Sequence, residues 1–124
     1  MTTVVDASVV LAWLQDEPGA DEAEPMLMEG VIGAANWSEV LQKARQHGAP
    51  AEVVGRLLAS FGLTVVEVNA VDAELAADLW RSGTALSLAD RLCLALGLRT
   101  GDPVATADSV WGEVGGGPTV ILVR

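Results

Sequence analysis

Residues 103–108 read Pro-Val-Ala-Thr-Ala-Asp, and residues 3–6 read Thr-Val-Val-Asp. Each stretch is a short run of small or β-branched residues that ends at an acid. Runs of this kind, when they alternate with helical patterns along a chain, indicate buried parallel strands. We therefore expect two strands of one sheet here, with Asp6 and Asp108 at their carboxyl ends.

The rest of the chain continues this alternation. Further strands are predicted at 31–34, 64–68 and 119–123. Helices are predicted at 8–14, in part of 21–29, and at 36–48, 50–62, 71–80 and 87–98, with a short helix before the last strand. This order is typical of an α/β fold whose parallel sheet is covered on both faces. The chain has 124 residues and no linker, so a single domain over 1–124 is predicted.

Composition narrows the function classes. The chain is 51% apolar and 19% charged, as in globular domains, and its formal net charge is −10. That charge by itself argues against a nucleic-acid partner, because phosphate binding normally leaves a basic footprint. One cysteine and one histidine exclude a structural zinc site. No apolar run is long enough to suggest a membrane span, and we expect a cytoplasmic protein.

Two more acids accompany the two at the strand ends. Glu39 lies about one turn into the helix after the second strand, and Asp90 lies about one turn into the helix that Ser87 begins. If all four acids lie at the carboxyl edge of the sheet, they would repel one another as bare anions. A divalent cation resolves this repulsion, and all-oxygen ligands favour Mg²⁺ or Mn²⁺.

Each acid also has a plainer interpretation. The pairs Asn36 and Glu39, and Ser87 and Asp90, have the spacing of a helix-capping motif. Asp6 and Asp108, taken alone, suit helix caps or turns. The metal hypothesis depends on all four acids reaching one edge.

Four sequence blocks resemble the PIN-domain family, and most closely the VapC toxins of bacterial toxin–antitoxin pairs. The resemblance extends over essentially the whole chain, in the family's order. One departure is Ala89, where family members often have Gly before the third acid. The blocks are Val4-Val5-Asp6-Ala7-Ser8, Asn36-Trp37-Ser38-Glu39-Val40-Leu41, residues 86–96 around Leu88-Ala89-Asp90-Arg91, and Val104-Ala105-Thr106-Ala107-Asp108-Ser109-Val110-Trp111.

The resemblance implies a PIN-like α/β/α sandwich with a five-stranded parallel sheet, and a Mg²⁺- or Mn²⁺-dependent endoribonuclease that cuts transfer or ribosomal RNA. It implies a small VapB-type antitoxin as partner, and a homodimer or a toxin–antitoxin hetero-oligomer. The metal and catalytic residues that it implies are Asp6, Glu39, Asp90 and Asp108, with Ser8 and Thr106 as supporting hydroxyls. For these two hydroxyls, capping or strand filling is an equal alternative.

The sequence also predicts the location or the contacts of several other residues. Cys93 is predicted to be an inert core thiol, and His47 to lie at a helix C-terminus. Arg91 is expected at the surface, where it pairs with an acid or contacts RNA. Lys43 and Arg45 are better candidates for RNA contact, although Lys43 could instead pair with Glu39. A group of four apolar residues could form a groove, although core packing is expected for most of them: Trp13, Met26, Met28 and Trp80.

The sequence also bears on two other function classes. A receiver-type phosphoacceptor domain would need an aspartate at the end of the third strand and a lysine near the fifth, but the third strand ends Glu67-Val68-Asn69 and the chain's lysine is Lys43. A non-catalytic acidic domain that binds a basic protein stays open. Walker-type nucleotide binding is excluded because no Gly-Lys-Ser/Thr occurs.

Overall fold

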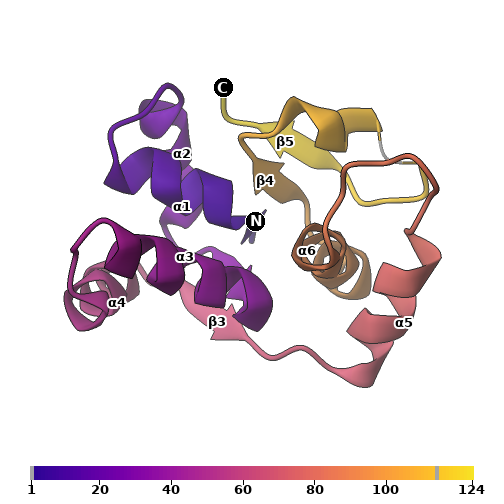
Figure 1. Ribbon diagram of the computed structural model, residues 1–124, viewed down its shortest axis with the longest axis horizontal. Helices are drawn as coiled ribbons and strands as arrows, with labels where there is room; N and C mark the ends of the chain where they lie inside the picture. The colour runs from indigo at the N-terminus through magenta and orange to yellow at the C-terminus, as the bar shows by residue number, and fades with distance from the viewer. Residues whose placement is uncertain (1, 114) are drawn as a thin grey trace.

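The computed structural model describes residues 2–113 and 115–124 of the chain, and it is an α/β/α sandwich (Figure 1). The elements in chain order are β1 (Val4–Val5), α1 (Ala7–Leu14), α2 (Ala20–Leu27), β2 (Val31–Gly33), α3 (Ala34–Gln46), α4 (Ala51–Ser60), β3 (Thr64–Val66), α5 (Ala70–Asp78), α6 (Leu88–Thr100), β4 (Val104–Thr106), the 3₁₀ helix η1 (Ser109–Glu113) and β5 (Val120–Leu122).

The sheet has five parallel strands, as the family resemblance implies, and their order is β3-β2-β1-β4-β5. The chain builds β1, β2 and β3 outward in one direction and then returns to place β4 on the other side of β1. Val4 is in register with both Val31 and Val104, so β1 is the central strand. The strand order therefore reverses between β1 and β4, where parallel sheets bind their ligands.

Alternate residues of the strands face two separate cores. Val5, Ile32 and Ala105 pack with helices α1 to α4 on one face of the sheet. Val4 and Val104 pack with α6, with Leu79 after α5 and with Trp111 of η1 on the other face. Helices cover both faces, which explains why the strands are apolar throughout rather than alternating with polar residues.

One local prediction was wrong. Helix α3 begins at Ala34 with Gly33 as its N-cap, so Asn36 does not begin this helix. In α2, Pro25 lies inside the helix, although a proline is favourable only near a first turn. Buried Ala23 and Leu27 pack α2 onto the core, and this packing outweighs the hydrogen bond that Pro25 cannot donate.

Candidate active site

Asp6 lies directly after β1 and is only 5% exposed. It is the N-cap of α1, and its Oδ1 accepts a hydrogen bond from the Ser8 backbone N–H. Its Oδ2 accepts from two hydroxyls, Ser8 Oγ at 3.0 Å and Thr106 Oγ1 at 2.6 Å. The capping interpretation of Asp6 is therefore confirmed, but this carboxylate is also held by two further donors.

The two hydroxyls are in turn held by consecutive backbone amides after β4. The Ala107 N–H donates to Ser8 Oγ at 2.9 Å, and the Asp108 N–H donates to Thr106 Oγ1 at 3.1 Å. Each hydroxyl thus accepts from an amide and donates to Asp6 Oδ2. Hydrogen bonds in such chains polarise and strengthen one another. Ser8 and Thr106 therefore fix Asp6 against the carboxyl end of β4.

Glu39 is not a capping residue, because α3 begins five residues before it, at Ala34. Its Oε1 instead accepts a hydrogen bond of 3.2 Å from Asn36 Nδ2, which also donates to the Ala89 carbonyl at 3.3 Å. Asn36 is 1% exposed and so connects Glu39 on α3 to the first turn of α6. The sequence reasoning missed this role, since the spacing of Asn36 and Glu39 was interpreted as a cap.

Asp90 does form the capping box that the sequence predicts. Its Oδ2 accepts from the Ser87 N–H at 3.0 Å, and the Ser87 hydroxyl accepts from the Asp90 N–H at 3.1 Å. This cap fixes the carboxylate at the start of α6, the helix that Asn36 joins to Glu39. A carboxylate has about four acceptor sites, and the Ser87 N–H occupies one of those on Asp90.

Three of the four acids influence one another electrostatically. Burial raises the pKa of Asp6, and the nearby Asp90 raises it further, against the lowering by Thr106 and Ser8. Burial likewise raises the pKa of Glu39, with added repulsion from Asp6 and Asp90. Burial raises the pKa of the Cys93 thiol well above its ordinary value, with the same three acids adding to it. Cys93 is fully buried, in agreement with an inert core thiol.

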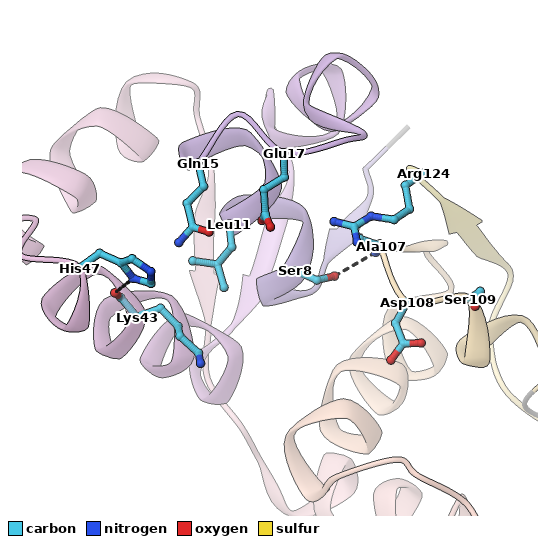
Figure 2. Close-up of a pocket in the computed structure, with 10 residues that line it drawn as sticks. All are labelled: Ser8, Leu11, Gln15, Glu17, Lys43, His47, Ala107, Asp108, Ser109 and Arg124. Carbon is cyan, nitrogen blue, oxygen red and sulfur yellow. Dashed lines mark hydrogen bonds between the residues drawn. The ribbon is translucent and has the colours of Figure 1, made fainter.

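Asp108 lines a cleft of about 600 Å³, and its backbone N–H is linked to Asp6 through the Thr106 hydroxyl. It is exposed, and its Oδ1 accepts from the Val110 N–H at 3.0 Å. Figure 2 shows the cleft between α3 on one side and the segment after β4 on the other. Its lining residues are Ser8, Leu11, Gln15, Glu17, Lys43, His47, Ala107, Asp108, Ser109 and Arg124.

The donor set of the four acids consists only of carboxylate oxygens, which suits Mg²⁺ or Mn²⁺ rather than softer metals. Burial and the neighbouring acids raise the pKa values of Asp6 and Glu39, so a cation at this site would relieve their repulsion. In the described part of the chain, no three acidic, histidine or cysteine side chains converge closely enough to hold an ion as they stand. By the chemistry of their oxygen donors, the four residues fit a hard cation.

The other expectations have mixed outcomes. His47 is the C-cap of α3, as predicted. The prediction of a surface Arg91 is wrong, because it is half-buried and its Nη1 donates to the Ala76 carbonyl of α5 at 2.8 Å. Trp13 and Met26 pack on the core. Met28 and Trp80 are each 59% exposed, and they follow α2 and α5 on opposite faces of the sheet, so the four do not form one groove.

Comparison with known proteins gives one family match and a set of structural neighbours. The toxin–antitoxin complex from Klebsiella pneumoniae superposes with a TM-score of 0.76 at 20% identity, over 98% of both chains. VapBC from Salmonella typhimurium, bound to DNA, gives 0.74 at 16% identity over 100% of this chain and 99% of that chain. VapC20 of Mycobacterium tuberculosis, a sarcin-ricin loop cleaving toxin, gives 0.73 at 15% identity, over 91% of this chain and 95% of that chain.

No curated protein sequence matches the chain. No helix among the described residues is long and apolar enough to cross a membrane. The sequence model of the PIN domain matches residues 3–117, which include the four acids and strands β1 to β4. The chain therefore belongs to the PIN domain family.

Proposed function

We propose that this protein is the toxin of a type II toxin–antitoxin pair, and that it is a metal-dependent endoribonuclease. The observation that carries the proposal is the acidic site at the point where the strand order reverses. Asp6, Glu39 and Asp90 come from three different parts of the chain, and the charge of Asp90 raises the pKa of both Asp6 and Glu39. Membership of the PIN domain family and the VapBC neighbours support the same function.

Asp6, Asp90 and Asp108 would hold the ion directly, and Glu39 would complete this site or serve a second ion. A bound Mg²⁺ or Mn²⁺ supplies an activated water and neutralises charge on the transferring phosphate. Ser8 and Thr106 hold Asp6 in one orientation, and Asn36 does the same for Glu39. Such outer hydrogen bonds set the basicity and the direction of a metal ligand.

Hydrolysis at this site would leave a 3′-hydroxyl and a 5′-phosphate on a transfer or ribosomal RNA. The lone histidine is exposed at the C-cap of α3, where its ring contacts the Lys43 carbonyl. Cys93 is sealed in the core. The four carboxylates are therefore the groups that we assign to the chemistry.

The proposal includes a partner and a setting. A VapB-type antitoxin with a basic segment would complement a chain whose net charge is −10. We also propose one PIN domain over residues 1–124, a homodimer or a toxin–antitoxin hetero-oligomer, and action on RNA in the cytoplasm.

The main rival is an acidic domain that binds a basic protein without cleaving anything. Calorimetric titration of Mn²⁺ into the unchanged protein and into Asp6→Ala separates the two functions. An enzyme of the proposed kind should lose most of its affinity for Mn²⁺ in the Asp6→Ala variant. A protein that only binds a basic partner should have no metal binding that depends on Asp6.

The experiment that tests the endoribonuclease function is a map of RNA ends after the protein is induced in cells. Sequencing of 5′-phosphate ends should show new cuts at a few positions in transfer or ribosomal RNA. The same cuts should be absent when Asp90→Asn is induced to an equal level. Cuts that carry a 5′-hydroxyl would reject the metal-assisted hydrolysis.

A further inference from the structure

The cleft beside Asp108 gathers cationic side chains that the rest of the chain has in short supply. The sequence has 7 Lys and Arg against 17 Asp and Glu, and its single lysine and single histidine are Lys43 and His47. Both line this cleft, together with Arg124, which follows β5. Figure 2 shows Lys43 and Arg124 on opposite walls, with Asp108 on the same side as Arg124.

The local charge balance of the cleft differs from that of the whole molecule. Its charged lining residues are Lys43 and Arg124 on one hand and Glu17 and Asp108 on the other, so their formal charges cancel. Elsewhere acids outnumber bases by more than two to one. An RNA chain that approaches the acidic site along this cleft therefore meets less repulsion than the net charge of the whole chain suggests.

His47 is held in one orientation at the edge of the cleft. Its Nδ1 lies 2.9 Å from the Lys43 carbonyl oxygen, and a carbonyl can only accept, so Nδ1 carries the proton. The Nε2 atom is left for a ligand. The same turn of α3 thus presents both the Lys43 ammonium and a fixed imidazole to the cleft.

We propose that this cleft holds RNA phosphates next to the scissile bond, with Lys43 and Arg124 as positioning residues on its two walls. The inference rests on the proposed function, because it places the substrate of that same site. Both side chains would neutralise phosphate charge without reading bases, so they serve any sequence. Asp108 and Ser8, which donates to Asp6, both line the cleft, so the cleft adjoins the acidic site rather than forming a separate one.

The test measures RNA binding separately from cleavage. The probe is a fluorescein-labelled single-stranded RNA pool of about 12 nucleotides with all four bases at each position, which suits a short single-strand site. Binding is followed by anisotropy in an Asp90→Asn background, with Lys43→Gln and Arg124→Gln added singly and together. Arg45 was the other expected RNA contact, but it does not line this cleft and lines two other hollows instead, so our inference assigns it no RNA contact. Arg45→Gln on the same helix is therefore the matched control.

Each cleft variant should weaken binding about fourfold at about 0.15 M salt and reduce the salt slope by about 0.7, the value for one single-strand phosphate contact. The double variant should show both losses, while Arg45→Gln should bind within about twofold of its background. In the background that retains Asp90, Lys43→Gln should raise KM and leave kcat nearly unchanged, as expected for uniform binding.

Two failures can be told apart. If Lys43→Gln and Arg124→Gln bind RNA as Arg45→Gln does, the cleft does not hold RNA and the inference is wrong, even if the enzyme cleaves. A cleft that serves only a protein partner would give this same unchanged RNA affinity. If Asp90→Asn cleaves RNA at the rate of the unchanged protein, the proposed function is wrong, and the binding data still decide the cleft.

Discussion

The hydroxyl of Thr106 donates a hydrogen bond of 2.6 Å to Oδ2 of Asp6, and it accepts one of 3.1 Å from the Asp108 N–H. One side chain thus joins the ends of two neighbouring strands, β1 and β4, across the point where the strand order reverses. Thr106 is completely buried, so water cannot replace this donor at Asp6. The orientation of the Asp6 carboxylate therefore depends on Thr106.

Thr106→Val keeps the shape of the side chain but removes the donor to Asp6. We expect the free energy of unfolding to fall by about 1–2 kcal/mol, because a buried carboxylate loses a partner. We expect RNA cleavage to fall by about 10- to 100-fold, as for other residues that orient metal ligands. Urea unfolding and initial cleavage rates measure the two effects.

Two variants control this prediction. Thr106→Ser restores the hydroxyl and should recover most of the cleavage rate. Thr64→Val makes the same chemical change at an exposed position of β3 and should change stability by less than about 0.5 kcal/mol. An equal loss of cleavage in Thr106→Ser and Thr106→Val would show that packing, rather than the hydrogen bond, matters at this position.

The raised pKa values of Asp6 and Glu39 predict how stability depends on pH in metal-free protein. Their ordinary values are 3.8 and 4.5, and the folded state holds their protons to higher pH than the unfolded state does. The contribution of these two carboxyls to the free energy of unfolding should therefore be fully present below these values and should be lost as pH rises through the raised pKa values.

Glu39→Gln tests this dependence directly. The amide oxygen still accepts from Asn36, while the repulsion from Asp6 and Asp90 disappears. We expect the free energy of unfolding to rise by about 0.5 kcal/mol or more at pH 7, and this gain to vanish near pH 4. Glu74→Gln, an exposed change on α5, is the control and should show no such gain. Lower stability of Glu39→Gln at pH 7 in the presence of EDTA would refute the repulsion.

Asn36→Asp tests the residue that joins Glu39 to α6. The introduced carboxylate cannot donate to Glu39 or to the Ala89 carbonyl, and it adds a buried negative charge beside another acid. We expect the free energy of unfolding to fall by about 2–4 kcal/mol at pH 7, because an unpaired charge is buried. Because protonation restores a donor, the loss should shrink at low pH, and urea unfolding at two pH values measures it.

Asn36→Ala separates the two parts of that loss. It removes the donor to Glu39 without adding charge, so the free energy of unfolding should fall by less than in Asn36→Asp and should change less between pH 7 and low pH. If Asn36→Asp and Asn36→Ala lose the same stability at both pH values, the electrostatic part of the prediction is wrong.

Gly97 on α6 packs so closely against β4 that no side chain fits. A Cβ there would lie within 3 Å of Val104 Cγ2, so one of the two elements must move. We expect Gly97→Ala to cost about 1–3 kcal/mol through overpacking. Gly55→Ala is the matched control, because Gly55 is also helical and its Cβ would meet only Trp37 at 3.7 Å. That variant should gain about 0.5–1 kcal/mol, and a gain in both would show that α6 can shift.

The sequence predicted the fold well because the strands and helices differ clearly in pattern. Apolar runs such as Val104 to Thr106 are short and β-branched, and Ser87 marks the start of α6 by its capping box. The acids at strand ends could be placed at one edge because parallel strands all end there. The start of α3 was missed because Gly33 is a cap without a side chain, and Asn36 has the more familiar capping side chain.

The neighbours of the acids could not be predicted in the same way. Asn36 reaches Ala89 across 53 residues of sequence, and Arg91 donates to Ala76 on another helix. Such contacts depend on how helices pack, which no local spacing reveals. The cleft is a similar case, since it is lined by Lys43 on α3 and by Arg124 after β5, which are far apart in the sequence.

The central claim is that the acidic site cleaves RNA with the help of a divalent cation. The most direct measurement incubates the purified protein, free of any antitoxin, with total RNA in Mg²⁺ or in EDTA, beside Asp90→Asn and the control Asp78→Asn. Asparagine can still accept from Ser87 at the cap of α6, so Asp90→Asn removes charge and spares the helix. We predict cleavage in Mg²⁺ by the unchanged protein and by Asp78→Asn, and none in EDTA or by Asp90→Asn. Cleavage that persists in EDTA, or at an undiminished rate in Asp90→Asn, would contradict the account.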